Sequence, residues 1–320
     1  MEVSRRLFLV GAAAAAATPA LAVWKGGLDP NKIVFFADPH ISGKWAVDHQ
    51  KKFLAKFVAE VVAMEPKPAN VVFLGDLANG WGFVEDYRDF AKIVAPIEQA
   101  GIKMTLAMGN HDKRVNFLKQ FPQYAETTKV PGRIVSEVNT PYADLILLDT
   151  LWEGDKLEGE NHVDGAFDEA QRKWLVARLA AATKPVFVAA HHYLSEKGLG
   201  IRKLLVQSPA VHGYIYGHEH EWRSMYESDG GYTNRQNVRT ACIPSSGHFG
   251  DIGYCTLDIG PDKAVMTVRQ TDHFFNYPCP TAFRQKGWDE VVRENDGRKM
   301  TFFYDKPPKP QESRPWKQGK

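Results

Sequence analysis

The chain has 320 residues, of which 44% are hydrophobic and 24% are charged. This composition is typical of a globular protein and excludes a collagen, a coiled coil and a polytopic membrane protein. Lysine and arginine number 40 against 38 aspartates and glutamates, so the balance gives no basic field that would favour duplex nucleic acid as a specific partner. Three cysteines cannot build a disulfide framework.

Residues 1–22 are typical of a cleaved export signal. Arg5 and Arg6 precede an uncharged apolar run, and a small-x-small cleavage pattern stands just before Val23. The run is short and only mildly apolar for a bilayer span, so we expect no stable membrane anchor. The stretch SRRLFL at 4–9 resembles a twin-arginine signal, although an ordinary secretory signal with two arginines also fits. Both interpretations predict a periplasmic or secreted bacterial protein, and the first adds the twin-arginine translocase as export partner.

Short apolar runs rich in Val and Ile recur along the chain and predict buried strands. These runs are Ile33–Ala37, Asn70–Leu74, Lys103–Met108, Asp144–Leu148, Pro185–Ala190 and Tyr214–Tyr216. Helical spacing of apolar residues between the runs predicts helices at Lys51–Met64, Phe83–Ala100 and Glu169–Ala182. Alternating strands and helices predict an α/β fold built from βαβ units, with helices covering a sheet.

The pattern changes after His220, where hairpins predict a second, mostly antiparallel sheet packed against the first. The hairpin strands are expected at Val238–Ile243, Gly253–Ile259 and Ala264–Gln270. We expect one domain over residues 23–280 and a C-terminal extension over 281–320. The final stretch, 306–320, contains Lys, Arg and Pro and predicts a solvated basic tail, which by itself would be a weak membrane tether.

Five polar fragments stand just past the carboxyl ends of the predicted strands, where open α/β sheets bind their ligands. They are Asp38-Pro39-His40, Gly75–Asn79, Gly109–Asp112, His191-His192 and Gly217–His220. Their His, Asp and Asn side chains are ligands for divalent transition metals. Two cations about 3.5–4 Å apart need a bridging carboxylate and an open position for water, together with neutral imidazoles. The fragments supply all of these groups.

The ordered motifs D-x-H, G-D-x-x-N, G-N-H-D, H and G-H-x-H resemble those of the calcineurin-like metallophosphoesterase superfamily, from about Ile33 to His220. The resemblance implies a four-layer αββα sandwich, in which two packed mixed β-sheets are flanked by helices. It implies hydrolysis of a small-molecule phosphoester by in-line attack of a metal-bound hydroxide. The implied cofactors are two divalent metal ions, with Mn, Zn and Fe all compatible with the ligands.

Carried over residue by residue, the resemblance assigns the first metal to Asp38, His40, Asp76 and His220. It assigns the second metal to Asp76, Asn110, His191 and His218, so that Asp76 bridges. His111 would protonate the leaving oxygen or stabilise the transition state electrostatically. Asp112 would orient His111 by accepting a hydrogen bond from its other ring nitrogen.

Several neighbouring residues have two interpretations. Consecutive strand residues point to opposite faces, so one of His191 and His192 faces the metals while the other packs or contacts substrate, and the resemblance favours His191. Asn79 stands where purple acid phosphatases carry a tyrosine, which argues against a ferric-tyrosinate centre. Asn79 is then either a turn residue or a residue close to the substrate.

The remaining histidines and tryptophans are expected to be ordinary packing or surface residues. Substrate contact is the alternative for His49 and His162, and a substrate platform is the alternative for the tryptophans. The others in this group are His212, His248, His273, Trp45, Trp81 and Trp152. Cys242 and Cys255 are expected in neighbouring hairpin strands, as free buried thiols.

The substrate class follows from the same motifs. Ser/Thr protein phosphatases carry G-D-x-V-D-R-G, whereas Leu-Ala-Asn-Gly follows Asp76 here, and the export signal disfavours a nuclease of the Mre11 type. The motifs look more like the cyclic-nucleotide and glycerophosphodiester phosphodiesterase branch. A phosphodiesterase is therefore expected, with a phosphate-scavenging phosphomonoesterase as the alternative. A non-catalytic binding module is disfavoured because no ligand is missing.

Overall fold

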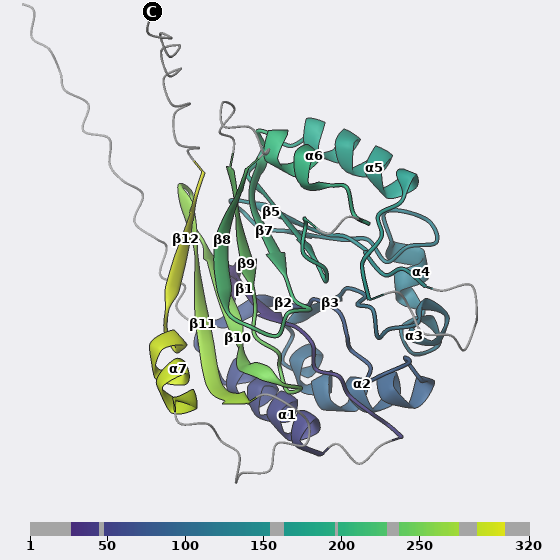
Figure 1. The fold of residues 1–320 in the computed structure, drawn as a ribbon, viewed down its shortest axis with the longest axis vertical. Helices are drawn as coiled ribbons and strands as arrows, with labels where there is room; N and C mark the ends of the chain where they lie inside the picture. Colours follow the sequence, from purple (N-terminus) through teal and green to yellow (C-terminus); the bar gives the residue numbers. More distant parts are fainter. Residues whose placement is uncertain are drawn as a thin grey trace, which may run out of the picture.

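A computed structural model describes residues 27–44, 48–153, 163–195, 198–228, 237–274 and 287–304. Two six-stranded mixed sheets pack face to face, and helices lie on their outer sides (Figure 1). The expected export signal, the basic tail, Trp45 and His162 lie outside the described residues. Among the helices that are described, none is long and apolar enough to cross a membrane.

The first sheet has the strand order β12-β11-β10-β1-β2-β3. Its strands are β1 (Leu28–Phe36), β2 (Lys67–Phe73), β3 (Lys103–Leu106), β10 (Gly250–Ile259), β11 (Lys263–Phe274) and β12 (Lys299–Phe303). β1, β2 and β3 run parallel, while β10, β11 and β12 follow one another antiparallel on the free side of β1. The carboxyl ends of β1, β2 and β3 therefore meet at one edge.

The second sheet has the order β4-β5-β6-β7-β9-β8. Its strands are β4 (Ser136–Asn139), β5 (Asp144–Leu147), β6 (Val186–Ala190), β7 (Val211–Tyr216), β8 (Arg223–Ser228) and β9 (Asn237–Cys242). β5, β6, β7 and β9 run parallel, and β4 and β8 close the two sides antiparallel. All predicted strands before His220 are present, each within a few residues of its expected bounds.

Helices cover both outer faces. The helices are α1 (Asp48–Val62), α2 (Val84–Gln99), α3 (Arg114–Gln120), α4 (Gln123–Thr127), α5 (Glu169–Ala180), α6 (Arg202–Gln207) and α7 (Trp288–Asn295). Strand alternation builds the layers: Val34 and Phe36 of β1 pack under α1 and α2, whereas Ile33 and Phe35 face the second sheet. α5 and α6 cover the far side of the second sheet. The predicted four-layer αββα fold is confirmed.

The prediction of a separate, mostly antiparallel second sheet is wrong. β9 pairs in parallel with β7 in the second sheet, while β10 pairs antiparallel with β1 in the first. Hairpin patterning indicates which strands turn back on each other, but the sheet edge that they join depends on tertiary packing. Cys242 and Cys255 are free buried thiols as expected, but they lie in different sheets. Residues beyond the expected boundary at 280 also contribute β12 to the first sheet.

Candidate metal centre

The polar fragments meet at the carboxyl edge shared by the two sheets. Loops after β1, β2 and β3 supply three fragments from the first sheet, and loops after β6 and β7 supply two from the second. The site therefore lies across the seam between the sheets. The structure brings together all seven residues that the sequence assigned to metals: Asp38, His40, Asp76, Asn110, His191, His218 and His220.

Five of these residues have a left-handed backbone. In the described part of the chain, positive φ values outside glycine occur at Asp38 (51°), His40 (45°), Asp76 (49°), His218 (70°) and His220 (53°). This conformation is uncommon for residues with a Cβ and costs roughly 1–3 kcal/mol at each position. Strain of this kind gathers at functional sites, because the surrounding structure holds each side chain in one direction.

The first group of donors surrounds His40 and His220. The Nε2 atoms of these two rings lie 3.3 Å apart, and His220 Nε2 is 3.3 Å from Asp38 Oδ1. Asp76 Oδ2 is 3.5 Å from His40 Nε2. Asp38 is itself fixed, because the amide of His218 donates to its carboxylate at 3.0 Å. Two carboxylates and two imidazoles thus converge on one point.

The second group shares Asp76 with the first. His191 Nε2 lies 3.2 Å from Asp76 Oδ2, 3.0 Å from Asn110 Oδ1 and 3.2 Å from His218 Nδ1. The other nitrogen of His191 lies 2.9 Å from the Leu74 carbonyl, which accepts only a hydrogen and therefore keeps Nδ1 protonated. Burial lowers the pKa of His191, but the carboxylate of Asp76 outweighs it and raises that pKa to about 9, so Nε2 would release its proton on binding a cation. Because the carboxylate of Asp76 touches both groups, it stands in the position of a bridging ligand.

The chemistry of these donors fits two divalent cations. Burial lowers the pKa of His40 well below its usual value and lowers that of His218 to about 4. Both rings are therefore neutral at neutral pH, the form that binds metals. Ring nitrogens with lone pairs face carboxylate, amide and imidazole acceptors at close range, an arrangement that a cation would satisfy. Buried Nδ1 atoms of His40 and His220 have no hydrogen-bond partner within the described residues.

His111 stands beside the donors but has a different partner from the one expected. Its amide donates to Asp76 Oδ1 at 2.8 Å, and its ring lies 4.9 Å from that of His40, centroid to centroid. The expected hydrogen bond from its ring to Asp112 is wrong, because His111 Nδ1 donates to the Gly80 carbonyl at 3.0 Å. This bond leaves Nε2 as the nitrogen that can exchange a proton at the site.

Asp112 instead holds the loops in place. Its buried carboxylate accepts hydrogen bonds from three amides and one hydroxyl, those of Leu77, Ala78, Gly109 and Tyr87. These bonds tie the loop after β2 to the loop after β3. The sequence could not distinguish this role from the expected one, because both place Asp112 next to His111.

His192 lies beside the second group, because one ring nitrogen each of His191, His192 and His218 lie within 4.8 Å of one another, but both of its ring nitrogens also have other partners. Thr150 Oγ1 lies 2.7 Å from His192 Nδ1, and the Val163 carbonyl lies 3.1 Å from Nε2. Since both nitrogens are engaged, His191 is the member of the pair that faces Asp76, as the resemblance favoured. His192 tethers two loops beside the site.

His248 is a site residue that sequence reasoning missed. Its ring stacks on His40 with the centroids 4.0 Å apart, and Gln50 Nε2 lies 2.5 Å from its Nδ1. Its amide donates to Ser245 Oγ, which in turn donates to the Asp38 carbonyl. The segment Ser245–His248 follows β9, which is parallel to β7 and therefore ends at the ligand edge. An antiparallel hairpin strand, as the sequence predicts for β9, would not end at the ligand edge, so the sequence does not indicate that His248 lies there.

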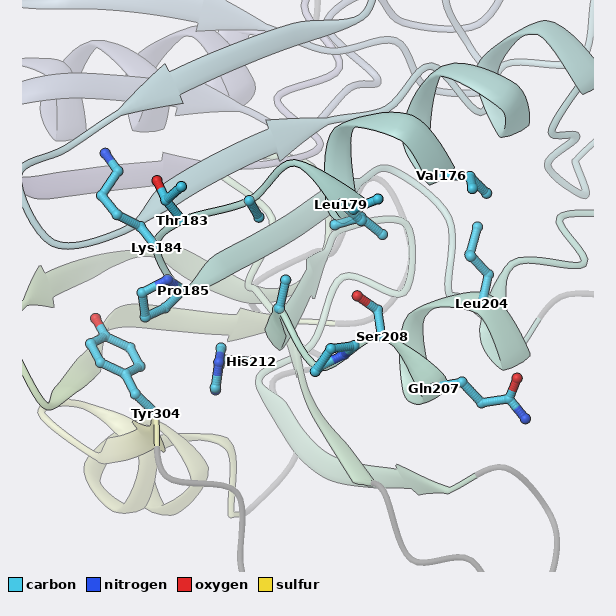
Figure 2. Close-up of a pocket in the computed structure, with 14 residues that line it drawn as sticks. Val176, Leu179, Thr183, Lys184, Pro185, Leu204, Gln207, Ser208, His212 and Tyr304 are labelled. Atoms are coloured by element: carbon cyan, nitrogen blue, oxygen red, sulfur yellow. The ribbon is translucent and has the colours of Figure 1, made fainter.

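The other described histidines differ in their surroundings: His49 Nε2 lies 3.4 Å from the His248 carbonyl, and His273 Nδ1 lies 2.6 Å from Asp251 Oδ1. Asn79 forms a turn, with its amide bonded to Ile41 and its carbonyl to Trp81. His212 lines a groove of about 620 Å³ together with Lys184, Pro185 and Tyr304 (Figure 2). That groove lies at the amino ends of β6 and β7, and none of the metal-site residues lines it.

Comparison with known proteins identifies a matching family and a protein of related sequence. The calcineurin-like phosphoesterase family matches residues 31–222, a span that includes every candidate ligand. A probable cyclic nucleotide phosphodiesterase from Rhodopseudomonas palustris is 31% identical over 174 residues, covering 52% of this chain and 59% of that protein. The match thus spans about three-fifths of the relative's length.

A solved structure shares the fold of this chain. A purple acid phosphatase from yellow lupin seeds superposes with a TM-score of 0.56 at 13% identity, over 85% of this chain and 53% of that one. The calcineurin-like phosphoesterase YfkN from Bacillus subtilis gives a TM-score of 0.43 at 14% identity, over 85% and 90% of the two chains. At 13% identity the likeness to the purple acid phosphatase concerns the fold alone.

Proposed function

We propose that this chain, which belongs to the calcineurin-like phosphoesterase family, is an exported two-metal hydrolase of small phosphodiesters. The observation that carries the proposal is the single carboxylate of Asp76 between two groups of imidazole donors. Such a pair of sites is the arrangement that family members use on phosphoesters. When bound, two divalent cations would supply Lewis acidity and an activated water.

The residues of the chain would then bind, orient and exchange protons. Asp38, His40 and His220 would hold one cation and Asn110, His191 and His218 the other, with Asp76 shared. His111 would transfer a proton through Nε2 to the leaving oxygen, because the Gly80 carbonyl keeps Nδ1 protonated. The transfer requires the doubly protonated ring, whose Nδ1 proton stays in the hydrogen bond to the Gly80 carbonyl.

Two observations favour a phosphodiester over a phosphomonoester as the proposed substrate. The relative from Rhodopseudomonas palustris is named a probable cyclic nucleotide phosphodiesterase, and the G-D-L-A-N and G-N-H-D motifs look like that branch. A phosphate-scavenging monoesterase uses the same donors and is the alternative. The export proposal rests on residues 1–22, and periplasmic fractionation of cells expressing the wild type or an Arg5→Lys, Arg6→Lys variant tests it.

The test of function compares two substrates in one assay. The chain from Val23 onward is loaded with Mn or Zn, and kcat/KM is measured for bis-p-nitrophenyl phosphate and p-nitrophenyl phosphate. We expect a preference of at least about 10-fold for the diester. A preference for the monoester would select the alternative, and failure to hydrolyse either ester with any metal would reject a phosphoesterase. The Asp76→Ala variant, purified identically, controls for contaminating phosphatase.

A further inference from the structure

Exposed apolar side chains lie on segments that are tied to the candidate metal centre by backbone contacts. Trp81 (51%), Trp152 (43%) and Val163 (64%) stand on connecting loops, and Val115 (50%) stands in the first turn of α3. The Val163 carbonyl accepts from His192. Large aromatic side chains left in water beside a catalytic site indicate a surface that binds an apolar group of the ligand.

Trp81 is carried on a turn that the site itself holds rigid. Its amide donates to the Asn79 carbonyl at 3.1 Å, and the carbonyl just before it, that of Gly80, accepts from His111. On the other side, Asn116 donates to the Gly82 carbonyl at 2.9 Å. The backbone of Trp81 is thus fixed next to the residue proposed to protonate the leaving group.

The indole of Trp81 has aromatic and cationic support. Its ring centroid lies 6.2 Å from that of Phe83, and the ammonium of Lys44 sits 3.4 Å from the centre of the Phe83 ring. Phe83 begins the turn into α2, where its amide donates to Asp86 at 3.0 Å. The two rings are tilted by 53° to each other, so the indole of Trp81 supplies the aromatic surface by itself, with a positive charge over the neighbouring Phe83 ring.

Trp152 lies on a second loop, after β5, and this loop is tied to the segment that follows Asp112. The guanidinium of Arg114 donates to the Leu151 carbonyl at 2.6 Å and to Glu153 at 2.6 Å, so the residues on both sides of Trp152 are tied to the segment after Asp112. Thr150, in the same loop as Trp152, has its hydroxyl 2.7 Å from Nδ1 of His192, which follows β6. Both exposed tryptophans are therefore anchored to the start of α3, Trp81 through Asn116 and Trp152 through Arg114.

We propose that Trp81, with Trp152 on the second loop, forms the base-binding surface of the enzyme and stacks on the nucleobase of a cyclic nucleotide whose phosphate occupies the metal centre. This inference rests on the proposed function and narrows its substrate class from small phosphodiesters to those that carry a planar base. Stacking of a base on an aromatic side chain is sequence-tolerant and strong enough to change binding by roughly 5- to 150-fold.

The experiment separates base binding from chemistry. Steady-state kinetics are measured with cyclic AMP and with glycerophosphoethanolamine, a diester that has no aromatic ring, for the wild type and for Trp81→Ala, Trp81→Phe and Trp152→Ala. We expect Trp81→Ala to raise KM for cyclic AMP about 10-fold while kcat changes less than about 2-fold. Trp81→Phe should recover most of the loss, and KM for glycerophosphoethanolamine should stay unchanged. Trp152→Ala should give a smaller rise for cyclic AMP alone.

Phe303→Ala is the matched control, since Phe303 is 61% exposed on β12, far from the ligand edge. This variant should leave kcat and KM unchanged for both substrates. Equal losses on both diesters would overturn the inference, because Trp81 would then shape the metal site, and so would an unchanged KM for cyclic AMP. If the wild type hydrolyses no diester, the proposed function fails. The inference is then decided by calorimetric binding of cyclic AMP to the wild type and Trp81→Ala, and absence of wild-type binding overturns it.

Discussion

Asp76 is the residue on which both candidate cation positions depend. One of its carboxylate oxygens lies near His40 and His191, and the other accepts from the amide of His111. We expect Asp76→Ala to lower metal content from about two ions per chain to one or fewer and to reduce kcat/KM by at least 100-fold. Metal content is measured by inductively coupled plasma mass spectrometry after dialysis.

Asp89→Ala provides the control, because Asp89 pairs with Lys51 and Lys92 on the outer helices and should leave metal content and rate within about 2-fold. An Asp76→Ala variant that retained two ions and full activity would show that Asp76 does not bridge.

The proton-transfer role of His111 makes a different prediction. Removing the ring leaves the metal donors in place, so His111→Ala should keep its metals and lose rate only where the leaving group needs a proton. We expect kcat to fall about 100-fold for an alkyl diester and less than about 5-fold for a p-nitrophenyl ester. Stopped-flow or steady-state assays with both esters measure the ratio, and equal losses would exclude proton donation.

Among single residues, the sequence predicted the metal-donor side chains better than the contacts that hold them in place. The metal-ligating types were recognisable because each of Asp38, Asp76 and His191 follows an apolar run, and strand ends must converge. The partners of Asp112 and the position of His248 depend on how loops from different strands touch. No local pattern records those contacts, so the sequence alone predicts a different role for each residue.

The turns after β2 and β3 determine how closely the ends of these two strands approach each other. Gly75, with φ of +93°, ends β2, and a Cβ there would lie 2.5 Å from the amide nitrogen of Gly109 after β3. This close approach would let the Asp76 and Asn110 side chains hold the same cation. A methyl group would force the two strand ends apart and displace donors that sit about 3 Å from their neighbours.

We therefore expect Gly75→Ala to lower the free energy of unfolding by roughly 3 kcal/mol or more, and to weaken metal binding as well. Gly101→Ala is the matched control, because Gly101 also has positive φ (+78°) but a Cβ there would meet nothing within 4 Å. It should cost only the left-handed conformation, about 1 kcal/mol. Urea unfolding of both variants measures the difference, and equal costs would contradict the steric argument.

Among the elements, the long ones with clear periodicity could be predicted and the short or late ones could not. α1, α2 and α5 display apolar spacing over several turns, whereas α3 and α4 are short and lack such a signal. β9 and β10 were recognised as strands, but their sheets were not, because β9 pairs with β7 through a parallel contact that adjacent sequence does not specify.

Over the whole molecule, the candidate metal centre joins the two sheets. β1, β2 and β3 of one sheet and β6 and β7 of the other supply its donors, so a cation bound there would contact both halves of the sandwich. The inter-sheet core from Ile33 to Phe302 holds the layers together without metal. Cation binding to the folded chain should therefore add to the stability of the entire domain rather than of one loop.

This coupling predicts a metal-dependent melting temperature. At a free Mn²⁺ concentration of about 100 times Kd, a single site that forms only on folding stabilises the native state by about 2.7 kcal/mol. For a domain of this size each kcal/mol raises Tm by roughly 2–4 °C, so the chelated protein should melt about 5–10 °C below the loaded one in differential scanning calorimetry. Asp76→Ala should lose most of this difference, whereas Asp89→Ala should retain it. An equal Tm with chelator and with Mn²⁺, Zn²⁺ or Fe²⁺ would mean that these donors hold no cation.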